Sequence, residues 1–184
     1  MVFILLGDGF EEIEALAPLD LLRRADIEVA TVSLMGDLIV RGGHNLTVKA
    51  DITLEQVDIE ALEMLVLPGG GEGVASIADS KVAMRLIKRI WEEGKLIGAI
   101  CAAPSLLAVL NIINGMNVAC HPTVAGRIIA VGGKIQPEFA VNRDRNLITG
   151  KAVGASMEFG LELVAALRGH EESDNLRRAI YYGG

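Results

Sequence analysis

Short apolar runs alternate along this chain with longer stretches whose apolar residues recur at helical spacing. The runs at residues 2–6, 64–67 and 96–100 hold almost no polar side chain, which is typical of strands buried on both faces. We expect further strands at residues 28–34 and 117–119, a hairpin over residues 38–48, and a second hairpin that pairs residues 139–142 with 147–149 through Arg143 and Asp144. Helices are expected over residues 10–25, from an N-cap at Ser80 to Glu93, and over residues 104–110, 155–167 and 174–182.

The alternation of strands and helices predicts the fold class. Apolar strands separated by helices favour a mostly parallel sheet covered by helices on both faces, which is an α/β sandwich. The length of 184 residues suits a single domain built on one such sheet. Sheets of this kind bind ligands at the carboxyl ends of their strands. We therefore look for chemistry after Leu6, Leu67, Ile100 and Ala119.

An uncharged stretch runs from residue 96 to residue 126. Its first part, residues 96–113, has the length of a membrane span, but Pro104 and Ser105 interrupt it and no aromatic belt flanks it. We interpret it as a buried strand, a sharp turn and a buried helix. Residues 1–6 carry no basic segment ahead of their apolar run, so we expect no secretory signal.

Composition and charge narrow the class of protein and its expected partners. Hydrophobic residues make up 51% of the chain, aromatic residues only 4%, and there are two cysteines, which excludes a disulfide scaffold and a disordered tail. The formal net charge of −7, without any Lys/Arg-rich run, argues against nucleic acid as a partner. Two cysteines without a pairing motif are typical of a reducing compartment. We therefore expect a cytoplasmic protein that binds neither nucleic acid nor membranes.

Cys101 directly follows a predicted strand, in the sequence Gly-Ala-Ile-Cys-Ala-Ala-Pro. A nucleophile on a strained strand-to-helix turn requires small residues two positions to either side, and Ala99 and Ala103 satisfy that requirement. The helix that starts at Pro104 would direct its dipole at the sulfur and lower the pKa of the thiol. Free cysteines are also among the residues most often buried, and Cys120 fits that structural interpretation.

Other strand ends carry possible partners for this thiol. Residues 68–73 hold four glycines, whose N–H groups can supply half of an oxyanion hole, with Ala102 supplying the other half; a plain tight turn is the alternative. Glu11 and Glu12 suit the positive first turn of the first helix. Glu14 lies in an apolar stripe of that helix, where its carboxyl group either reaches solvent or is buried. Burial would raise its pKa and make it a proton donor or acceptor near neutral pH.

Among the three histidines, His121 alone follows a predicted strand, where the base of a cysteine nucleophile could lie. A loop histidine without a role is the alternative. His44 falls in a glycine-rich turn and His170 in a polar loop. No histidine or cysteine pair has metal-ligand spacing, so we expect neither a metal nor a cofactor.

These motifs together resemble a known family. Residues 9–14 (Gly-Phe-Glu-Glu-Ile-Glu), 66–70 (Val-Leu-Pro-Gly-Gly), 99–104 (Ala-Ile-Cys-Ala-Ala-Pro) and 121–122 (His-Pro) are similar to the ThiJ/PfpI superfamily. They are most similar to its DJ-one branch, the parkinsonism-associated deglycase proteins. The match follows the order of the chain and closes with residues 154–159.

The resemblance implies a flavodoxin-like sandwich, a homodimer, and a single domain of this type over residues 1–184. It implies that Cys101 is the reactive thiolate, that Glu14 is hydrogen-bonded to it, and that His121 stands nearby. It also implies that Gly70 and Ala102 offer backbone N–H donors to the substrate. Protease-like members carry a His directly after the cysteine, where this chain has Ala102, so a protease triad is not expected.

The activity that the resemblance implies needs the cysteine and no cofactor. Its substrates are α-oxoaldehydes, such as methylglyoxal and glyoxal, or their early adducts with proteins and nucleotides, as for a glyoxalase III or deglycase in glycation defence. The rival interpretation is a redox sensor or redox-regulated chaperone without turnover, in which Glu14 stabilises oxidised Cys101. A small hydrolase or amidase is a third hypothesis, which the missing adjacent His disfavours.

Overall fold

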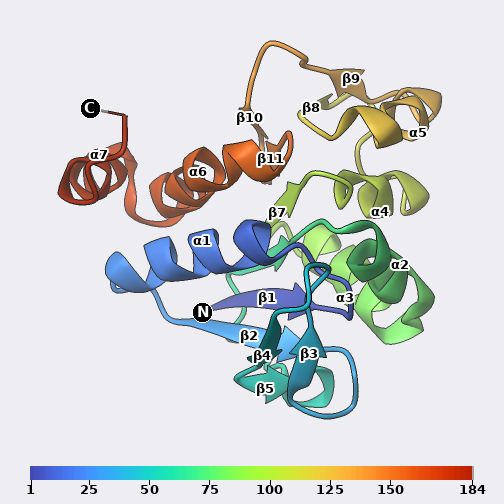
Figure 1. Ribbon diagram of the computed structural model, residues 1–184. Helices are drawn as coiled ribbons and strands as arrows, with labels where there is room; N and C mark the ends of the chain where they lie inside the picture. Colours follow the sequence, from blue (N-terminus) through green and yellow to red (C-terminus); the bar gives the residue numbers. More distant parts are fainter. Residues whose placement is uncertain (184) are drawn as a thin grey trace.

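Figure 1 shows the computed structural model of the chain, which describes residues 1–183. Its strands are β1 (Val2–Leu6), β2 (Val29–Ser33), β3 (Ile39–Arg41), β4 (Thr47–Lys49), β5 (Ile52–Thr53), β6 (Met64–Leu67), β7 (Leu96–Ile100), β8 (Asn117–Val118), β9 (Lys134–Ile135), β10 (Val141–Asp144) and β11 (Leu147–Gly150). Seven of them form one sheet in the order β10-β11-β7-β6-β1-β2-β5. Every neighbouring pair in this sheet is parallel except β10 with β11.

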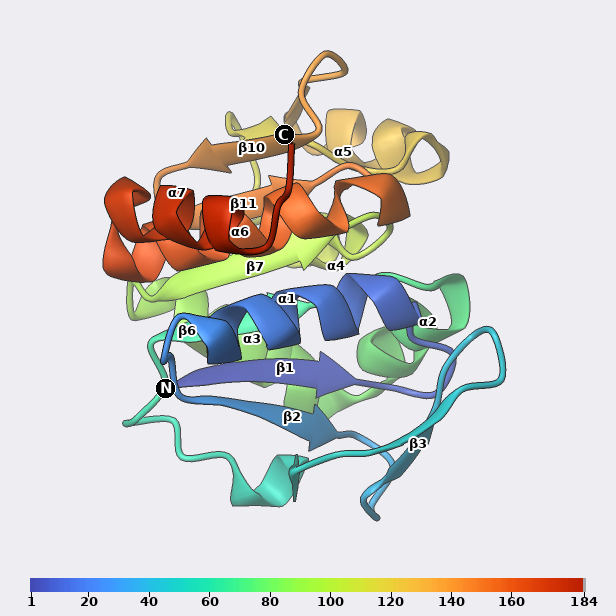
Figure 2. The same ribbon diagram turned by 60° about the vertical axis from the view of Figure 1, so that its left-hand side comes forward.

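Helices cover both faces of the sheet. They are α1 (Glu12–Arg24), α2 (Gly71–Asp79), α3 (Lys81–Glu92), α4 (Pro104–Val109), α5 (Ala125–Ala130), α6 (Ser156–Arg168) and α7 (His170–Ala179), with short 3-10 helices η1 (Leu54–Gln56), η2 (Pro122–Val124) and η3 (Val153–Ala155). Helices α1, α6 and α7 lie on one face, and α2, α3 and α4 on the other (Figure 2). The predicted α/β sandwich of the flavodoxin-like type is therefore confirmed.

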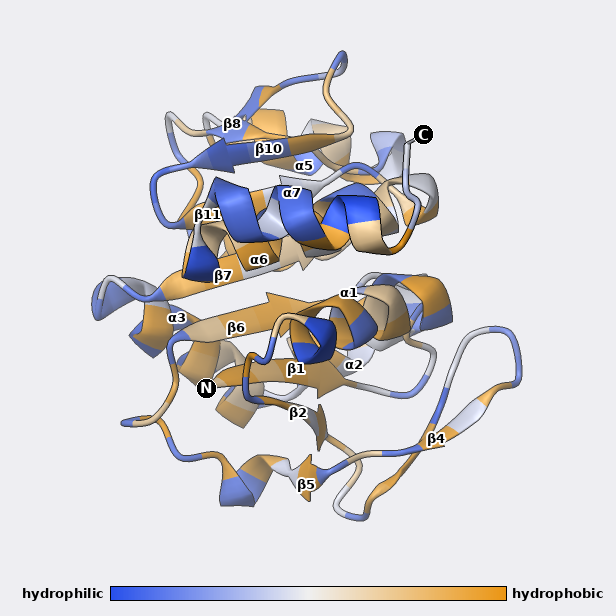
Figure 3. Ribbon diagram, turned by 90° about the vertical axis from the view of Figure 1, so that its left-hand side faces the viewer, coloured by the Kyte–Doolittle hydropathy of each residue, from blue (hydrophilic) through white to orange (hydrophobic). Residues whose placement is uncertain are grey.

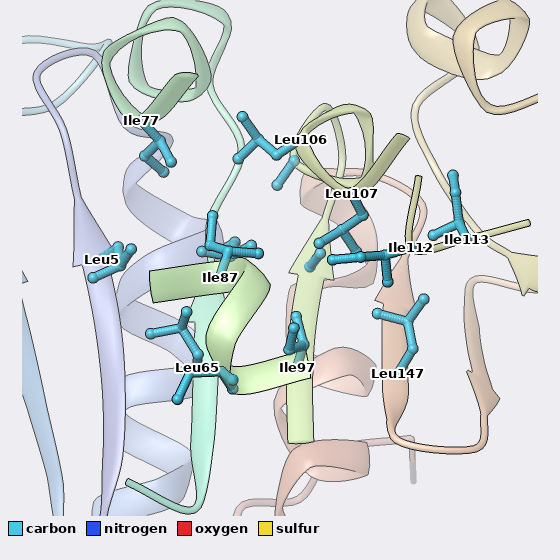
Figure 4. Close-up of a cluster of buried hydrophobic side chains, with 14 of the residues drawn as sticks. Leu5, Leu65, Ile77, Ile87, Ile97, Leu106, Leu107, Ile112, Ile113 and Leu147 are labelled. Atoms are coloured by element: carbon cyan, nitrogen blue, oxygen red, sulfur yellow. The ribbon is translucent and has the colours of Figure 1, made fainter. Parts of the chain in front are cut away.

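Each face of the sheet carries its own hydrophobic core. Phe3 and Leu5 of β1 join the core under α2, α3 and α4, whereas Val2, Ile4 and Leu6 join the core under α1 and α6. All five are at most 2% exposed, which explains why the strand is a continuous apolar run in the sequence. Figure 4 shows leucine and isoleucine side chains from the sheet and the helices meeting in the first core. The central strands β1, β6 and β7 are mostly hydrophobic, whereas strand β10 and the outer helix α7 are mostly hydrophilic (Figure 3).

The uncharged stretch at residues 96–126 begins as expected, with β7, a turn at Cys101, and then α4. The strand and the helix are almost entirely buried within the two cores. Among residues 1–183, we find no helix with both the length and the apolar character that crossing a bilayer requires.

The second hairpin turns two residues later than the sequence predicts. Arg143 and Asp144 belong to β10, and the turn consists of Arg145 and Asn146. Arg145 adopts a left-handed φ of +55°, a conformation that an arginine in the sequence does not predict. The Asp144 carboxylate accepts a hydrogen bond from the Asn117 N–H at 2.8 Å, which ties the hairpin to β8.

Several other predictions are wrong. The last helix begins at His170, directly after Gly169, so His170 starts a helix rather than lying in a loop. Strand β8 pairs with β9 outside the central sheet, so Ala119 does not follow a central strand. The sequence does not predict α2 or α5; two glycines in the first turn of α2 lower its helix propensity.

Candidate active site

The loops after β1, β6 and β7 meet at one edge of the sheet, because these three strands are parallel neighbours. An open pocket of about 330 Å³ lies there, lined by Glu11, Glu14, His44, Gly70, Gly71, Cys101, Ala102, His121, Thr123, Ala152 and Val153. All five site residues predicted from the sequence are in this set. A larger hollow of about 640 Å³ lies between η1 and α3, but neither a thiol nor a histidine lines it.

Cys101 occupies the strained turn that its small neighbours predict. Its φ of +63° lies in the left-handed region, which residues other than glycine rarely adopt. The Cys101 N–H donates to the Gly150 carbonyl at 2.9 Å, and its carbonyl accepts from the His121 N–H at 2.8 Å. Ala103 is fully buried, and a Cβ on Gly69 would lie only 2.7 Å from Cys101 Cβ. Small residues therefore permit this turn, and two backbone hydrogen bonds fix it.

Two backbone N–H groups face the Cys101 sulfur. The N–H groups of Gly70 and Ala102 donate to it and favour its ionised form. Gly70 is the N-cap of α2 with a φ of +87°, and a Cβ there would lie 2.7 Å from Glu11 N and overlap the Gly9 carbonyl oxygen. Only glycine therefore fits where the loop after β6 passes the loop after β1. The two N–H groups predicted to form an oxyanion hole both lie at the nucleophile.

Glu14 is fully buried on α1 beside the same thiol. Its Oε2 accepts a hydrogen bond from the Gly69 N–H at 2.8 Å, whereas Oε1 has no partner of regular geometry within residues 1–183. Burial raises the pKa of the Glu14 carboxyl group to about 7, and the charge of Glu11 adds to the rise, while hydrogen bonds with Cys101 and Gly69 oppose it. Glu14 can therefore both accept and donate a proton near neutral pH.

The pKa of the Cys101 thiol differs from the sequence-based expectation. Burial and the neighbouring Glu14 carboxylate raise the pKa of Cys101 to about 12, against the two backbone N–H donors. The dipole of α4 does not overcome them, because that helix has only six residues and the thiol faces a carboxylate. The two groups influence each other's ionisation, so the thiolate is favoured only when Glu14 holds the proton.

His121 lies at the pocket wall, as expected, but within residues 1–183 no side-chain hydrogen bond joins it to Cys101. Its Nδ1 lies 2.8 Å from Thr123 Oγ1 and accepts from the Thr123 N–H at 3.3 Å. Because a backbone N–H can only donate, Nδ1 is an acceptor and the neutral ring carries its proton on Nε2. In this tautomer His121 is a hydrogen-bond donor through Nε2.

Glu12 and His44 also belong to the site region, which the sequence does not indicate. Glu12 is buried and holds His44, rather than only complementing the first helical turn. Ligand atoms of Glu11, Glu12 and His44 lie within 4.8 Å of one another, although their positions in the sequence show no metal-ligand spacing. Both Glu12 oxygens are already bonded to His44. Only the folding of the hairpin over α1 brings these residues together, so no local signal in the sequence could have paired them.

Known proteins are similar to this chain in sequence and fold over most of its length. Residues 1–166 match the DJ-1/PfpI family. Parkinson disease protein 7 homolog of Danio rerio is 33% identical over 180 residues, which cover 96% of this chain and 94% of that protein. Glutathione-independent glyoxalase DJR-1.2 of Caenorhabditis elegans is 32% identical over 176 residues, which cover 87% and 93%. The crystal structure of Drosophila melanogaster DJ-1beta gives a TM-score of 0.94 at 29% identity, covering 100% of this chain and 98% of that one.

Proposed function

Because the chain belongs to the DJ-1/PfpI family, we propose that it is a cysteine-dependent enzyme that converts α-oxoaldehydes, such as methylglyoxal and glyoxal, into hydroxy acids. A relative named as a glutathione-independent glyoxalase supports this substrate class. The observation that carries the proposal is the pairing of Cys101 on its strained turn with the buried carboxyl group of Glu14 and two backbone N–H donors. Early adducts of the same aldehydes with proteins and nucleotides offer the same carbon to the thiol, which would be deglycation.

The reaction begins with the proton shared by Cys101 and Glu14. When Glu14 holds this proton, the thiolate adds to the aldehyde carbon of methylglyoxal, so that a C–S bond forms and the carbonyl oxygen becomes an alkoxide. The N–H groups of Gly70 and Ala102, which face the sulfur, stabilise that oxyanion. Glu14 then protonates the oxygen, which gives a hemithioacetal and leaves a carboxylate.

The Glu14 carboxylate next moves a proton between the two neighbouring carbons. It removes the proton from the carbon bonded to sulfur and returns it to the former ketone carbon, while the hydroxyl proton of the hemithioacetal passes to the former ketone oxygen, to which His121 Nε2 donates a hydrogen bond. The first carbon is thereby oxidised to a thioester and the second reduced to an alcohol. Water cleaves the thioester, releases lactate and restores the thiol. The overall reaction converts methylglyoxal and one water into lactate without net oxidation, so it requires no cofactor.

The test measures lactate after purified protein is mixed with methylglyoxal. Cys101→Ser and Glu14→Gln each remove one member of the pair, and both should lower kcat by about 100-fold or more. Cys120→Ser is the matched control, because Cys120 is buried in the core under α2, α3 and α4, and it should keep its activity. If the wild type forms no more lactate than Cys101→Ser, the proposed activity is wrong.

The same buried carboxyl group favours a second function, that of a redox sensor or redox-regulated chaperone. The raised pKa of Glu14 makes its neutral form available at physiological pH, and a neutral carboxyl group can donate a hydrogen bond to a cysteine sulfinate. Two molecules of hydrogen peroxide would oxidise the thiol to the sulfinic acid and leave as water. Mass spectrometry of Cys101 after mild peroxide should show two added oxygens that persist in the wild type and proceed to sulfonate in Glu14→Ala. The absence of this gain excludes the sensor.

We also propose that the protein works as a homodimer in the cytoplasm. Ile13, Leu46 and Val153 are 55%, 46% and 42% exposed and line one hollow beside the active site. Clustered aliphatic side chains of this kind favour burial against a second copy of the chain. Light scattering at micromolar concentration should give twice the mass of the chain, and Ile13→Asp should give the monomer. A wild type that is monomeric under these conditions excludes the dimer.

A further inference from the structure

The hairpin of β3 and β4 is tied across the turn that precedes α1, and this places His44 at the active site. The Gly9 N–H donates to the Arg41 carbonyl at 2.7 Å, and the Gly43 N–H donates to the Phe10 carbonyl at 2.9 Å. These hydrogen bonds hold the tip of the hairpin against the segment that leads into α1. The backbone of His44 is therefore fixed relative to the pocket.

Glu12 fixes the side chain of His44 as well. The residue is only 7% exposed; Oε1 accepts from the His44 N–H at 2.6 Å, and Oε2 lies 2.7 Å from His44 Nδ1. Burial alone would raise the pKa of Glu12, but the hydrogen bonds from His44 hold it below its ordinary value. A Cβ on Gly42 would lie 2.5 Å from Glu12 Cδ, so this glycine leaves room for the carboxylate. An ionised carboxylate can only accept, so Nδ1 carries a proton and Nε2 is the ring atom free for another partner.

His44 lines the active-site pocket and two adjoining hollows of about 410 and 300 Å³. The side chain is 77% exposed, and within residues 1–183 its Nε2 forms no hydrogen bond. The titratable groups that share these hollows with it are Glu11, Glu12, Glu14, Glu72, Cys101 and His121. The hydrogen bond and the charge of Glu12 raise the pKa of His44, and the charge of Glu11 adds to this. When it is protonated, His44 is a donor through both ring nitrogens and lies among carboxyl groups.

We propose that His44 binds the substrate and selects 1,2-dicarbonyl compounds over simple aldehydes, because Nε2 donates a hydrogen bond to the second carbonyl oxygen. Glu12 is the positioning residue that acts through it. This inference rests on the proposed function, in which Cys101 attacks one of two adjacent carbonyl carbons and the N–H groups of Gly70 and Ala102 bind the first oxygen. The second oxygen has two lone pairs, so it can accept a hydrogen bond from His44 Nε2 as well as the one from His121 Nε2. A simple aldehyde such as propanal has no second oxygen and gains nothing from the ring.

The test measures how well methylglyoxal and propanal shield Cys101 from alkylation by iodoacetamide at pH 7. Shielding requires addition to the thiol but no turnover. In a Cys120→Ser background, His44→Ala should raise the half-shielding concentration of methylglyoxal about tenfold, the effect of one ordinary hydrogen bond, and leave that of propanal unchanged. His170→Ala, which removes an exposed imidazole at the start of α7, is the matched control and should change neither value.

The pH dependence separates this role from a structural one. Shielding by methylglyoxal should weaken as His44 loses its proton, and Glu12→Gln should move that transition to lower pH, because it removes the charge that raises the His44 pKa. Propanal, which responds only to the Cys101–Glu14 pair, should show the same profile in all variants. Equal losses for both compounds in His44→Ala, or a transition that Glu12→Gln leaves in place, overturn the inference. Absence of lactate from the wild type would instead refute the enzyme activity, since shielding is independent of turnover.

Discussion

Replacement of Glu14 by glutamine should make the Cys101 thiol easier to ionise. Burial raises the pKa of Cys101 to about 12, and the charge of Glu14 and its hydrogen bond are the next causes of the rise. Glutamine has almost the same size as glutamate, so the thiol stays buried while the charge is lost, and the amide N–H can donate to a thiolate. The pKa should therefore fall from about 12 toward the ordinary value of 9.0.

The expected change in reactivity follows from these two pKa values. At pH 8, a thiol with a pKa of about 12 is ionised in roughly one molecule in ten thousand, and a thiol with a pKa of 9.0 in roughly one in ten. The rate of alkylation by iodoacetamide follows the thiolate fraction. Because burial keeps part of the rise, the Glu14→Gln variant should react about ten to a thousand times faster than the wild type at this pH.

The assay is the pH dependence of Cys101 alkylation, followed by mass spectrometry in proteins that also carry Cys120→Ser. The midpoint should lie at lower pH in Glu14→Gln than with Glu14 intact. This variant should nevertheless form less lactate, which would separate ionisation of the thiol from proton transfer between the substrate carbons. A midpoint that moves to higher pH would show that Glu14 favours the thiolate, and one that stays in place would show that Glu14 does not affect its ionisation. Either result would refute the reasoning.

Three further predictions concern stability. The pKa of Glu14 is about 7 in the folded chain against 4.5 in the unfolded chain, so the free energy of unfolding should fall by at most about 3 kcal/mol as pH rises from about 4.5 to about 7. Urea denaturation of Glu14→Gln should show no such pH dependence. If the dependence persists in this variant, Glu14 is not its source. Gly70→Ala places a Cβ against the Gly9 carbonyl at positive φ and should lower the free energy of unfolding by about 1–3 kcal/mol, together with lactate formation; a fully active variant would contradict the oxyanion role. Leu106→Ala empties a site that is 1% exposed and should cost about 2–5 kcal/mol in urea denaturation, whereas a smaller loss would mean that the core closes around the cavity.

The strands and the turn at the nucleophile could be predicted because neighbouring residues determine them. The apolar runs at residues 2–6, 64–67 and 96–100 are the strands β1, β6 and β7, with the expected boundaries. Small residues two positions either side of Cys101 predict its strained turn, and its φ of +63° confirms it. The family resemblance implied that Glu14 lies beside the thiol, and the sheet order explains it, because β1 and β7 flank β6.

Features that depend on residues distant in the sequence could not be predicted. The pKa of Cys101 follows from burial and from a carboxylate on another helix, whereas the local pattern showed only the dipole of α4. The pairing of His44 with Glu12 depends on how a hairpin folds over α1. The sequence of β8 is typical of a central strand, but β8 pairs with β9, and β11 lies beside β7 in the central sheet.

The topology of the sheet has a consequence for how the molecule is made. Glu14 follows β1, Cys101 follows β7 and His121 follows β8. A ribosome must therefore release about two thirds of the chain before all three residues are available to form the site. Until β6 emerges, the edge of β1 that pairs with it stays open to wrong partners. Recovery of catalysis after dilution from denaturant should therefore keep pace with assembly of the whole sheet, which makes lactate formation a reporter of global folding.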